Sequence, residues 1–255
     1  MSMKNLLFDR NANRALINRF EGRSIFSVLT GPSVNNHDLS QLKDRYTFTV
    51  KQLPITHLKP TIWLCMEKPQ IFPAEIWDDR TIIKVVCNAV YEKGYLREKN
   101  GIQRFEPVNK TTNIYWFKLS NSYSSEKYLT ENSVQWGNNS EITDEHGIKG
   151  RRSIMFAHFR LLHYMGFKKI YLLGVDFDMQ EAIPYCYDRV KTKHAVQQNN
   201  ILYDTLKIRL AAIYPKLLDA GIEVYNCNPQ SKLEVFPFKS YEECLNDSDS
   251  YLHRN

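Results

Sequence analysis

The stretch that decides the predicted fold is residues 151–188, RRSIMFAHFRLLHYMGFKKIYLLGVDFDMQEAIPYCYD. Its first half carries apolar residues at helical spacing and ends at Gly166, a residue type that commonly follows a helix. The apolar run 170–175 comes next, and such runs are typical of buried parallel strands. Asp176, Asp178 and Tyr185 follow it. Because open α/β sheets bind ligands beyond the carboxyl ends of their strands, we expect a functional site here.

The rest of the chain continues this alternation of strands and helices. Six more strands are expected, at residues 24–29, 46–53, 61–66, 81–87, 114–119 and 222–225. Helical segments are expected at residues 12–20, 38–42, 74–79, 195–220 and 240–245, with Pro215 bending or breaking the longest one. Strands that alternate with helices imply an α/β fold with a doubly wound, mostly parallel sheet.

Two segments do not fit the alternation. Residues 91–112 are charged and turn-rich, so a loop or excursion is expected there. Residues 121–150 are polar and contain Gly137, Gly147 and Gly150. A long segment of this composition is the best candidate for a mobile lid or an acceptor-facing insertion. The expected organisation is one domain over residues 1–255 with a small lid at 121–150.

Composition and charge narrow the function classes. The 255 residues are 43% hydrophobic and 24% charged, and the formal net charge of +6 favours an anionic ligand or an anionic surface. The basic residues are scattered and match no nucleic-acid-binding signature, so no nucleic-acid partner is expected. No apolar run approaches the roughly 18 residues of a membrane-spanning helix, which leaves only a peripheral membrane contact open.

The cysteines and the amino-terminal residues indicate the cellular compartment in which the protein works. The five cysteines are odd in number and form no Cys-x-x-Cys pattern, so we interpret them as reduced thiols. The first 20 residues lack the long apolar core of a signal peptide. Together these features predict a cytoplasmic protein.

Polar turns follow three of the expected strands. They comprise residues 30–33, 176–188 and 226–232. If the three strands are neighbours, the turns converge on one crevice at the edge of the sheet. Small and amide side chains suit ribose and phosphate, and a turn between a strand and a helix presents backbone N–H groups to a phosphate. The convergence therefore predicts a nucleotide-binding enzyme.

Several motifs in these turns carry a family resemblance. They are Gly31-Pro32-Ser33 after the first strand, Arg151-x-Ser153 before a helix, the run from Gly166 to Phe177, Tyr185-x-Tyr187-Asp188, His194, and Asn228-Pro229-x-Ser231. In their order and rough spacing the sequence resembles the bacterial sialyltransferases of glycosyltransferase family 42. It also resembles the related domain of flagellin nonulosonate transferases and 6-hydroxymethylpterin diphosphokinase-like proteins. The agreement is best over residues 151–235.

The resemblance implies a Rossmann-like variant of the GT-A architecture and an inverting glycosyltransferase. The implied donor is a CMP-activated sialic acid or related acidic sugar, the acceptor is a glycan, and no cofactor or metal is required. Homo-oligomers also fit the resemblance. His194 matches the general base and Tyr185 a hydroxyl that stabilises the departing phosphate. The residues implied to bind the donor are Thr30, Gly31, Pro32, Ser33, Arg151, Ser153, Gly174, Asp176, Asp188, Asn228 and Ser231.

The sequence departs from the family pattern at three positions. Thr30 stands where the family usually has Asn, Lys51 stands near a second nucleotide-binding Asn, and Asp178 stands near a second phosphate-contacting Tyr. Asp176 and Asp178 could instead hold Mg²⁺ in a pyrophosphokinase of the pterin type. A third alternative is a non-catalytic nucleotide-binding relative. For single residues, plainer interpretations also stand: His194 as a surface histidine, and Arg151 as a solvated charge.

Overall fold

The computed structural model describes residues 13–51, 58–137, 139, 141–182, 185–187 and 191–250. Its centre is a sheet of seven strands, every neighbouring pair of which runs parallel. The strands are β1 Ser24–Val28, β2 Thr47–Val50, β3 Ile62–Cys65, β4 Ile83–Cys87, β7 Ile114–Phe117, β10 Lys169–Leu173 and β11 Glu223–Asn226. All seven expected strands are therefore confirmed, and so is the doubly wound, Rossmann-like α/β fold.

The strand order decides where a ligand crevice lies. Across the sheet it is β11-β10-β1-β2-β3-β4-β7. The chain builds outward from β1 in one direction and then returns to add β10 and β11 on the opposite side of β1. Loops that leave neighbouring strands in opposite directions open a crevice at this reversal, beyond the carboxyl ends of β1 and β10.

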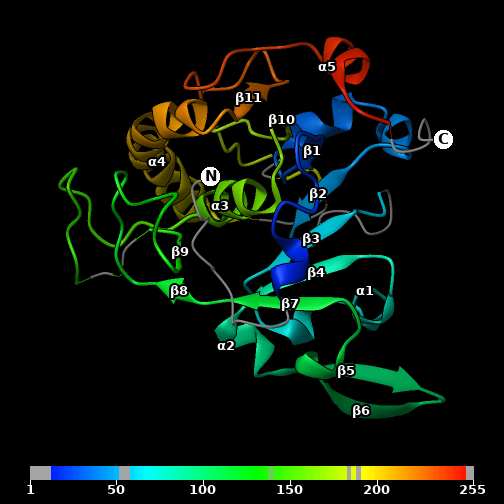
Figure 1. Cartoon of the computed structure of the whole chain (residues 1–255). Coiled ribbons are helices and arrows are strands. Elements are labelled where there is room, and N and C mark those ends of the chain that lie inside the picture. Colours follow the sequence, from blue (N-terminus) through cyan, green and yellow to red (C-terminus); the bar gives the residue numbers. More distant parts are fainter. Residues whose placement is uncertain are drawn as a thin grey trace.

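Helices cover both faces of the sheet (Figure 1). One face packs against α3 Ile154–Met165 and α4 Lys193–Asp219, and it forms the larger core. The other packs against η2 Pro32–Asn36, η3 Leu39–Leu42 and α5 Tyr241–Asp247 around Phe26 and Tyr171. The helix predicted before the apolar run 170–175 is thus confirmed as α3. It begins after the N-cap Ser153 and ends at Gly166, whose φ of 92° suits glycine.

His158 of α3 is a packing residue. It is fully buried, and its Nε2 lies 2.6 Å from the Ser27 Oγ of β1. Burial lowers the pKa of His158 to about 3, so the ring is neutral at physiological pH. It therefore joins α3 to the strand beside the crevice and is unsuited to proton transfer.

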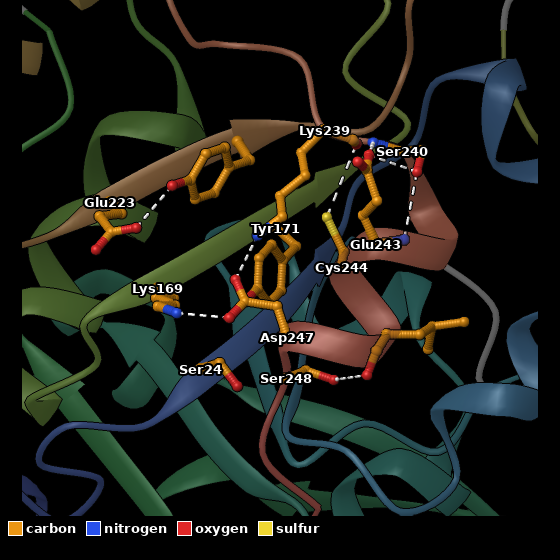
Figure 2. A network of polar contacts seen from close by, with 12 residues as sticks. Ser24, Lys169, Tyr171, Glu223, Lys239, Ser240, Glu243, Cys244, Asp247 and Ser248 are labelled. Atoms are coloured by element: carbon orange, nitrogen blue, oxygen red, sulfur yellow. Dashed lines mark hydrogen bonds and ion pairs between the residues drawn. The ribbon is translucent and has the colours of Figure 1, made fainter.

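A network of charges attaches α5 to the sheet (Figure 2). Asp247 accepts hydrogen bonds from Lys169 Nζ at 2.6 Å and from the Tyr171 hydroxyl at 2.9 Å, and it also accepts one from Lys239. The helix begins with a capping box between Ser240 and Glu243. The chain's last described helix is therefore held to β10, the strand next to the edge strand β11.

Two expectations about secondary structure were wrong in part. Residues 91–112 are not a loop but contain an antiparallel hairpin, β5 Gly94–Lys99 and β6 Ile102–Pro107. Its exposed, charged residues lack the apolar alternation that marks a strand. Pro215 does not break α4, which continues to Asp219. Ala211, whose carbonyl loses its hydrogen bond to the proline, is exposed and can bond to water instead.

Shorter elements complete the described chain. They are η1 Asn13–Leu16, η4 Pro69–Ile71, α1 Ala74–Asp78, α2 Asn88–Tyr91, η5 Val108–Lys110, β8 Leu119–Ser120 and β9 Val134–Gln135. All five cysteines are free thiols. Among the described residues, no helix combines the length and apolar character needed to cross a bilayer.

The segment expected to be a lid is attached to α4 by an ion pair. Arg209 Nε of α4 lies 2.7 Å from Asp144 Oδ2, and both side chains are fully buried. Arg209 also donates to the Arg151 carbonyl, and its guanidinium lies 4.7 Å from the Tyr123 ring. The segment is thus packed against the helices of the larger core at this point. Its motion as a lid stays a prediction.

Candidate functional site

The turns after β1, β10 and β11 meet at the carboxylate of Asp176. Its Oδ2 accepts the Ser33 backbone N–H at 3.0 Å, and its Oδ1 accepts the Ser33 hydroxyl. The Asn228 side-chain amide donates to the same Oδ1 at 2.7 Å. The predicted convergence of the three turns is therefore confirmed, and Asp176 is the residue that joins them.

Two glycines allow this close approach. A Cβ at Gly31 would lie 2.6 Å from the Gly174 carbonyl oxygen and closer still to the Asp176 carboxylate. Gly174 has a φ of 69°, a region that glycine enters without strain. The Gly31 N–H donates to the Gly174 carbonyl at 2.9 Å, which continues the β1–β10 pairing past the strand ends.

A cavity of about 120 Å³ lies at the reversal between β1 and β10. Six of the residues expected to bind the donor line it: Thr30, Gly31, Pro32, Ser153, Gly174 and Asp176. Tyr185, which is expected to contact the departing phosphate, and Lys51 line it as well. A second hollow of about 620 Å³ shares Pro32, Asp176 and Asp178 with it and is also lined by Ser33 and Asn228. The two hollows therefore flank Asp176 and together hold most of the expected site.

Tyr185 is held beside the turn that follows β1. The Cys186 backbone N–H donates to the Thr30 carbonyl at 3.1 Å. The rings of Tyr185 and Tyr187 stack with centroids 5.3 Å apart, and Lys191 Nζ lies 5.7 Å from the Tyr185 centroid. Of these two tyrosines, Tyr185 lines the cavity and Tyr187 does not. Asp188 lies outside the described residues.

His194 and Arg151 do not line either hollow. His194 is exposed in the first turn of α4. Asn200, about 9 Å further along the same helix, exchanges two hydrogen bonds with the Met179 backbone, so this part of α4 is attached to the loop after β10. The Arg151 carbonyl accepts a hydrogen bond from the Arg209 side chain. It lies two residues before Ser153, the N-cap of α3. Both assigned roles stay predictions.

Ser231 has a structural role in the turn after β11. Its hydroxyl donates to the Val175 carbonyl at 2.5 Å, and its oxygen accepts the Leu233 N–H at 3.1 Å. The Lys232 N–H donates to the Asp176 carbonyl at 2.8 Å. These bonds join the turns after β10 and β11, so Ser231 shapes the site through the backbone.

The comparisons with known proteins return structures and no sequence relatives. No protein-family model matches the sequence, and no curated protein does. One similar structure is the sialyltransferase CstII from Campylobacter jejuni in complex with cytidine-5'-monophosphate, with 14% identity, 86% of each chain covered and a TM-score of 0.45. The structure of the same enzyme with a trisaccharide acceptor and CMP matches with a TM-score of 0.46. The MAf glycosyltransferase from Magnetospirillum magneticum AMB-1 matches with a TM-score of 0.48 at 14% identity. This match covers 97% of the present chain and 38% of the MAf chain.

Sequence reasoning missed Tyr203, which reaches the cavity from α4. Its ring stacks on Phe177 with centroids 4.9 Å apart, and burial raises its pKa to about 12. Tyr203 therefore stays protonated and keeps a hydroxyl hydrogen to donate. Its position in the middle of a long helix gives no local signal. Only the packing of α4 over the strand ends brings it to the site.

Lys51 is the cation that lines the cavity from the end of β2. Its φ of 55° is in the left-handed region, and the buried Trp63 indole donates to its carbonyl at 2.9 Å. Among the described residues, its ammonium has no ion-pair partner. The sequence analysis treated Lys51 only as a departure from the family. Lys51 places one cationic group in a cavity that Asp176 and Asp178 also line.

Asp176, the first of the two aspartates, is poorly suited to bind a metal. Both oxygens of Asp176 already accept hydrogen bonds from Ser33, and Oδ1 accepts a further one from Asn228. Within the described parts of the chain, no cluster of three His, Cys, Asp or Glu side chains could coordinate an ion. Asp176 is thus committed to holding the turns together. The pyrophosphokinase alternative stays an untested hypothesis, because Mg²⁺ in nucleotide sites commonly takes one or two carboxylates together with the substrate's phosphates.

Proposed function

We propose that the protein is a glycosyltransferase that transfers sialic acid or a related acidic sugar from a CMP-activated donor to a glycan. The observation that carries the proposal is the convergence of three strand-end turns on Asp176, beside a cavity lined by Thr30, Ser153 and Tyr185. These are residues that the family resemblance assigns to the donor. The cationic Lys51 in the same cavity suits the negative charge of such a donor.

The proposed reaction needs two proton-handling groups. The bond between the anomeric carbon and the CMP phosphate oxygen breaks, and the acceptor hydroxyl oxygen forms the new bond to that carbon. His194 accepts the acceptor's proton, which is a suitable role for imidazole near neutral pH. The Tyr185 hydroxyl donates a hydrogen bond to the departing phosphate oxygen. The products are CMP and the glycoside.

The first experiment measures melting temperature with CMP, CDP, UDP, GDP and ATP, each with and without Mg²⁺. A ligand that binds only the folded chain stabilises it by about 2.7 kcal/mol at 100 times its Kd. The proposal expects stabilisation by CMP without metal. Stabilisation only by ATP with Mg²⁺ would favour the pyrophosphokinase instead, and binding of CMP without any turnover of CMP-sugars would favour the non-catalytic relative.

The second experiment tests the catalytic assignments by the rate of CMP release from a CMP-sugar with a glycan acceptor. We expect His194→Ala to lower kcat by a factor of about 100 to 10,000, because a general base contributes this much. Tyr185→Phe removes one donor to the departing charge and should lower kcat about 100-fold. Lys193→Ala, at the exposed neighbour of His194, is the control. Unchanged kcat in the His194 variant would refute this mechanism.

A further inference from the structure

The β5–β6 hairpin carries the two most exposed large apolar side chains among the described residues, together with a third exposed one. Phe105 is 62% exposed, Ile102 57% and Leu96 46%. Phe105 is the most exposed large hydrophobic residue among the described residues. The hairpin extends from the body beside β7, far from α3 and α4 (Figure 1). None of its residues lines the candidate site.

The hairpin is a rigid support for these side chains. Asn100 and Gly101 have φ values of 55° and 74°, as in the tight two-residue turns that match the twist of paired strands. At its base the Tyr95 ring stacks on Trp77 with centroids 5.4 Å apart, and the Tyr95 hydroxyl donates to Asp78. Its tip is therefore narrow and fixed in direction.

The apolar side chains have defined positions on the two strands. Leu96 and Phe105 lie directly opposite each other and share the face that points away from Tyr95. The Phe105 ring lies over Gly94, where any Cβ would collide with it. Ile102 follows the turn at the tip. The hairpin thus exposes Leu96 and Phe105 on one face and Ile102 on the other face at the turn, and its own fold leaves all three in water.

Basic residues accompany the apolar ones. Residues 93–107 contain four Lys or Arg and two Glu. Arg97 and Arg104 lie directly opposite each other, an unfavourable like-charge pair. Arg97 forms an ion pair with Asp78, whereas no described residue forms one with the exposed Arg104. An external anion beside Arg104 would relieve the repulsion.

We propose that the β5–β6 hairpin docks the protein onto an anionic lipid surface. Ile102 at the tip enters the headgroup region first, Phe105 follows from its position opposite Leu96 further along the hairpin, and Arg104 contacts lipid phosphates. Charge complementarity favours this occupant, since the chain is basic and the tip itself is basic. Three apolar side chains are few for a stable protein interface, which buries roughly 800 Å² on each partner. A narrow tip can enter a lipid surface with no matching pocket.

The test is co-sedimentation of the full chain with vesicles of phosphatidylcholine alone or mixed with phosphatidylglycerol. We expect binding to the anionic vesicles that weakens with salt. The double variant Ile102→Ser and Phe105→Ser should lose about tenfold or more in partitioning. Arg104→Gln should lose about fivefold. Ile208→Ser on α4 changes an equally exposed isoleucine away from the hairpin and should bind normally.

Melting temperatures and light scattering complete the test. The hairpin variants should melt within a few degrees of the wild type, because the changed side chains are exposed. Absence of vesicle binding by the wild type, or equal binding by the double variant, would overturn the proposal. A dimer that dissociates in the double variant, without vesicle binding, would assign the hairpin to a second copy of the chain instead.

Discussion

At the scale of single residues, Asp176 stabilises the site by accepting three hydrogen bonds from two other turns. Asp176→Ala would leave the Ser33 and Asn228 donors without this partner in a partly buried place. We expect a loss of about 1–3 kcal/mol in the free energy of unfolding. For a chain of this size that corresponds to a melting temperature lower by roughly 2–12 °C. The stabilisation by CMP should be lost as well.

Two further variants distinguish this role from a loss of charge in general. Asp204 is exposed and pairs only with Lys207 one turn away, so Asp204→Ala should change the melting temperature little. Gly31→Ala adds a methyl group where the Gly174 carbonyl and Asp176 carboxylate already lie. It should reproduce the Asp176→Ala phenotype. Normal CMP binding by both Gly31→Ala and Asp176→Ala would contradict the three-turn site.

A substitution at Lys51 can separate the effect of its backbone conformation on stability from the effect of its charge on ligand binding. Glycine freely adopts the left-handed backbone conformation that Lys51 has here. Lys51→Gly should therefore leave the free energy of unfolding within about 1 kcal/mol of the wild type. It also removes the cavity's ammonium. We expect weaker stabilisation by CMP, with a Kd raised several-fold, measured by thermal shift or calorimetry. Unchanged CMP affinity in Lys51→Gly would show that this cation takes no part in ligand binding.

At the scale of elements, the Arg209–Asp144 pair attaches segment 121–150 to α4. Removing one partner leaves the other charge buried, so Arg209→Ala and Asp144→Ala should each cost about 3–5 kcal/mol in the free energy of unfolding. The double variant should lose much less than the sum, which urea unfolding of the three variants would measure. Additive losses would mean that the two charges do not depend on each other.

The attachment of α5 depends on pH through Asp247. Although burial alone would raise its pKa, hydrogen bonds from Lys169, Lys239 and Tyr171 lower the pKa of Asp247 to about 2. The unfolded pKa is about 4, so this contribution to stability is present above pH 4 and is lost between pH 4 and pH 2. The melting-temperature difference between wild type and Asp247→Asn should therefore shrink over this range. A constant difference from pH 5 to pH 2 would contradict it.

At the scale of the whole molecule, the sheet was predictable from the sequence because its buried strands are short apolar runs between polar turns. The reversal at β1 and β10 followed from no single pattern, yet the three polar turns anticipated it. The hairpin was missed although Asn100-Gly101 is a strong turn signal, since its flanking residues are charged and exposed. Patterns of apolar residues in a sequence indicate which segments are buried, and a protruding hairpin buries few of its side chains.

The candidate site was predictable in part for a related reason. Residues next to strand ends, such as Thr30 and Asp176, are placed by local sequence alone. Tyr203 comes from the middle of α4, and its approach depends on how that helix packs across the sheet. The role of Asp176 as a junction was not decided by the sequence, because an Asp-x-Asp pattern suggests a metal ligand as readily as a hydrogen-bond acceptor in a turn.

The strand order also determines how the chain can fold while the ribosome is making it. β1 lies between β2, which is synthesised soon after it, and β10, which begins about 140 residues after β1 ends. At typical translation rates this interval is on the order of ten seconds. During that time one edge of a strand destined for the centre of the sheet stays open. The nascent chain must then avoid pairing that edge with a neighbouring chain, so its yield in cells will depend on chaperone supply.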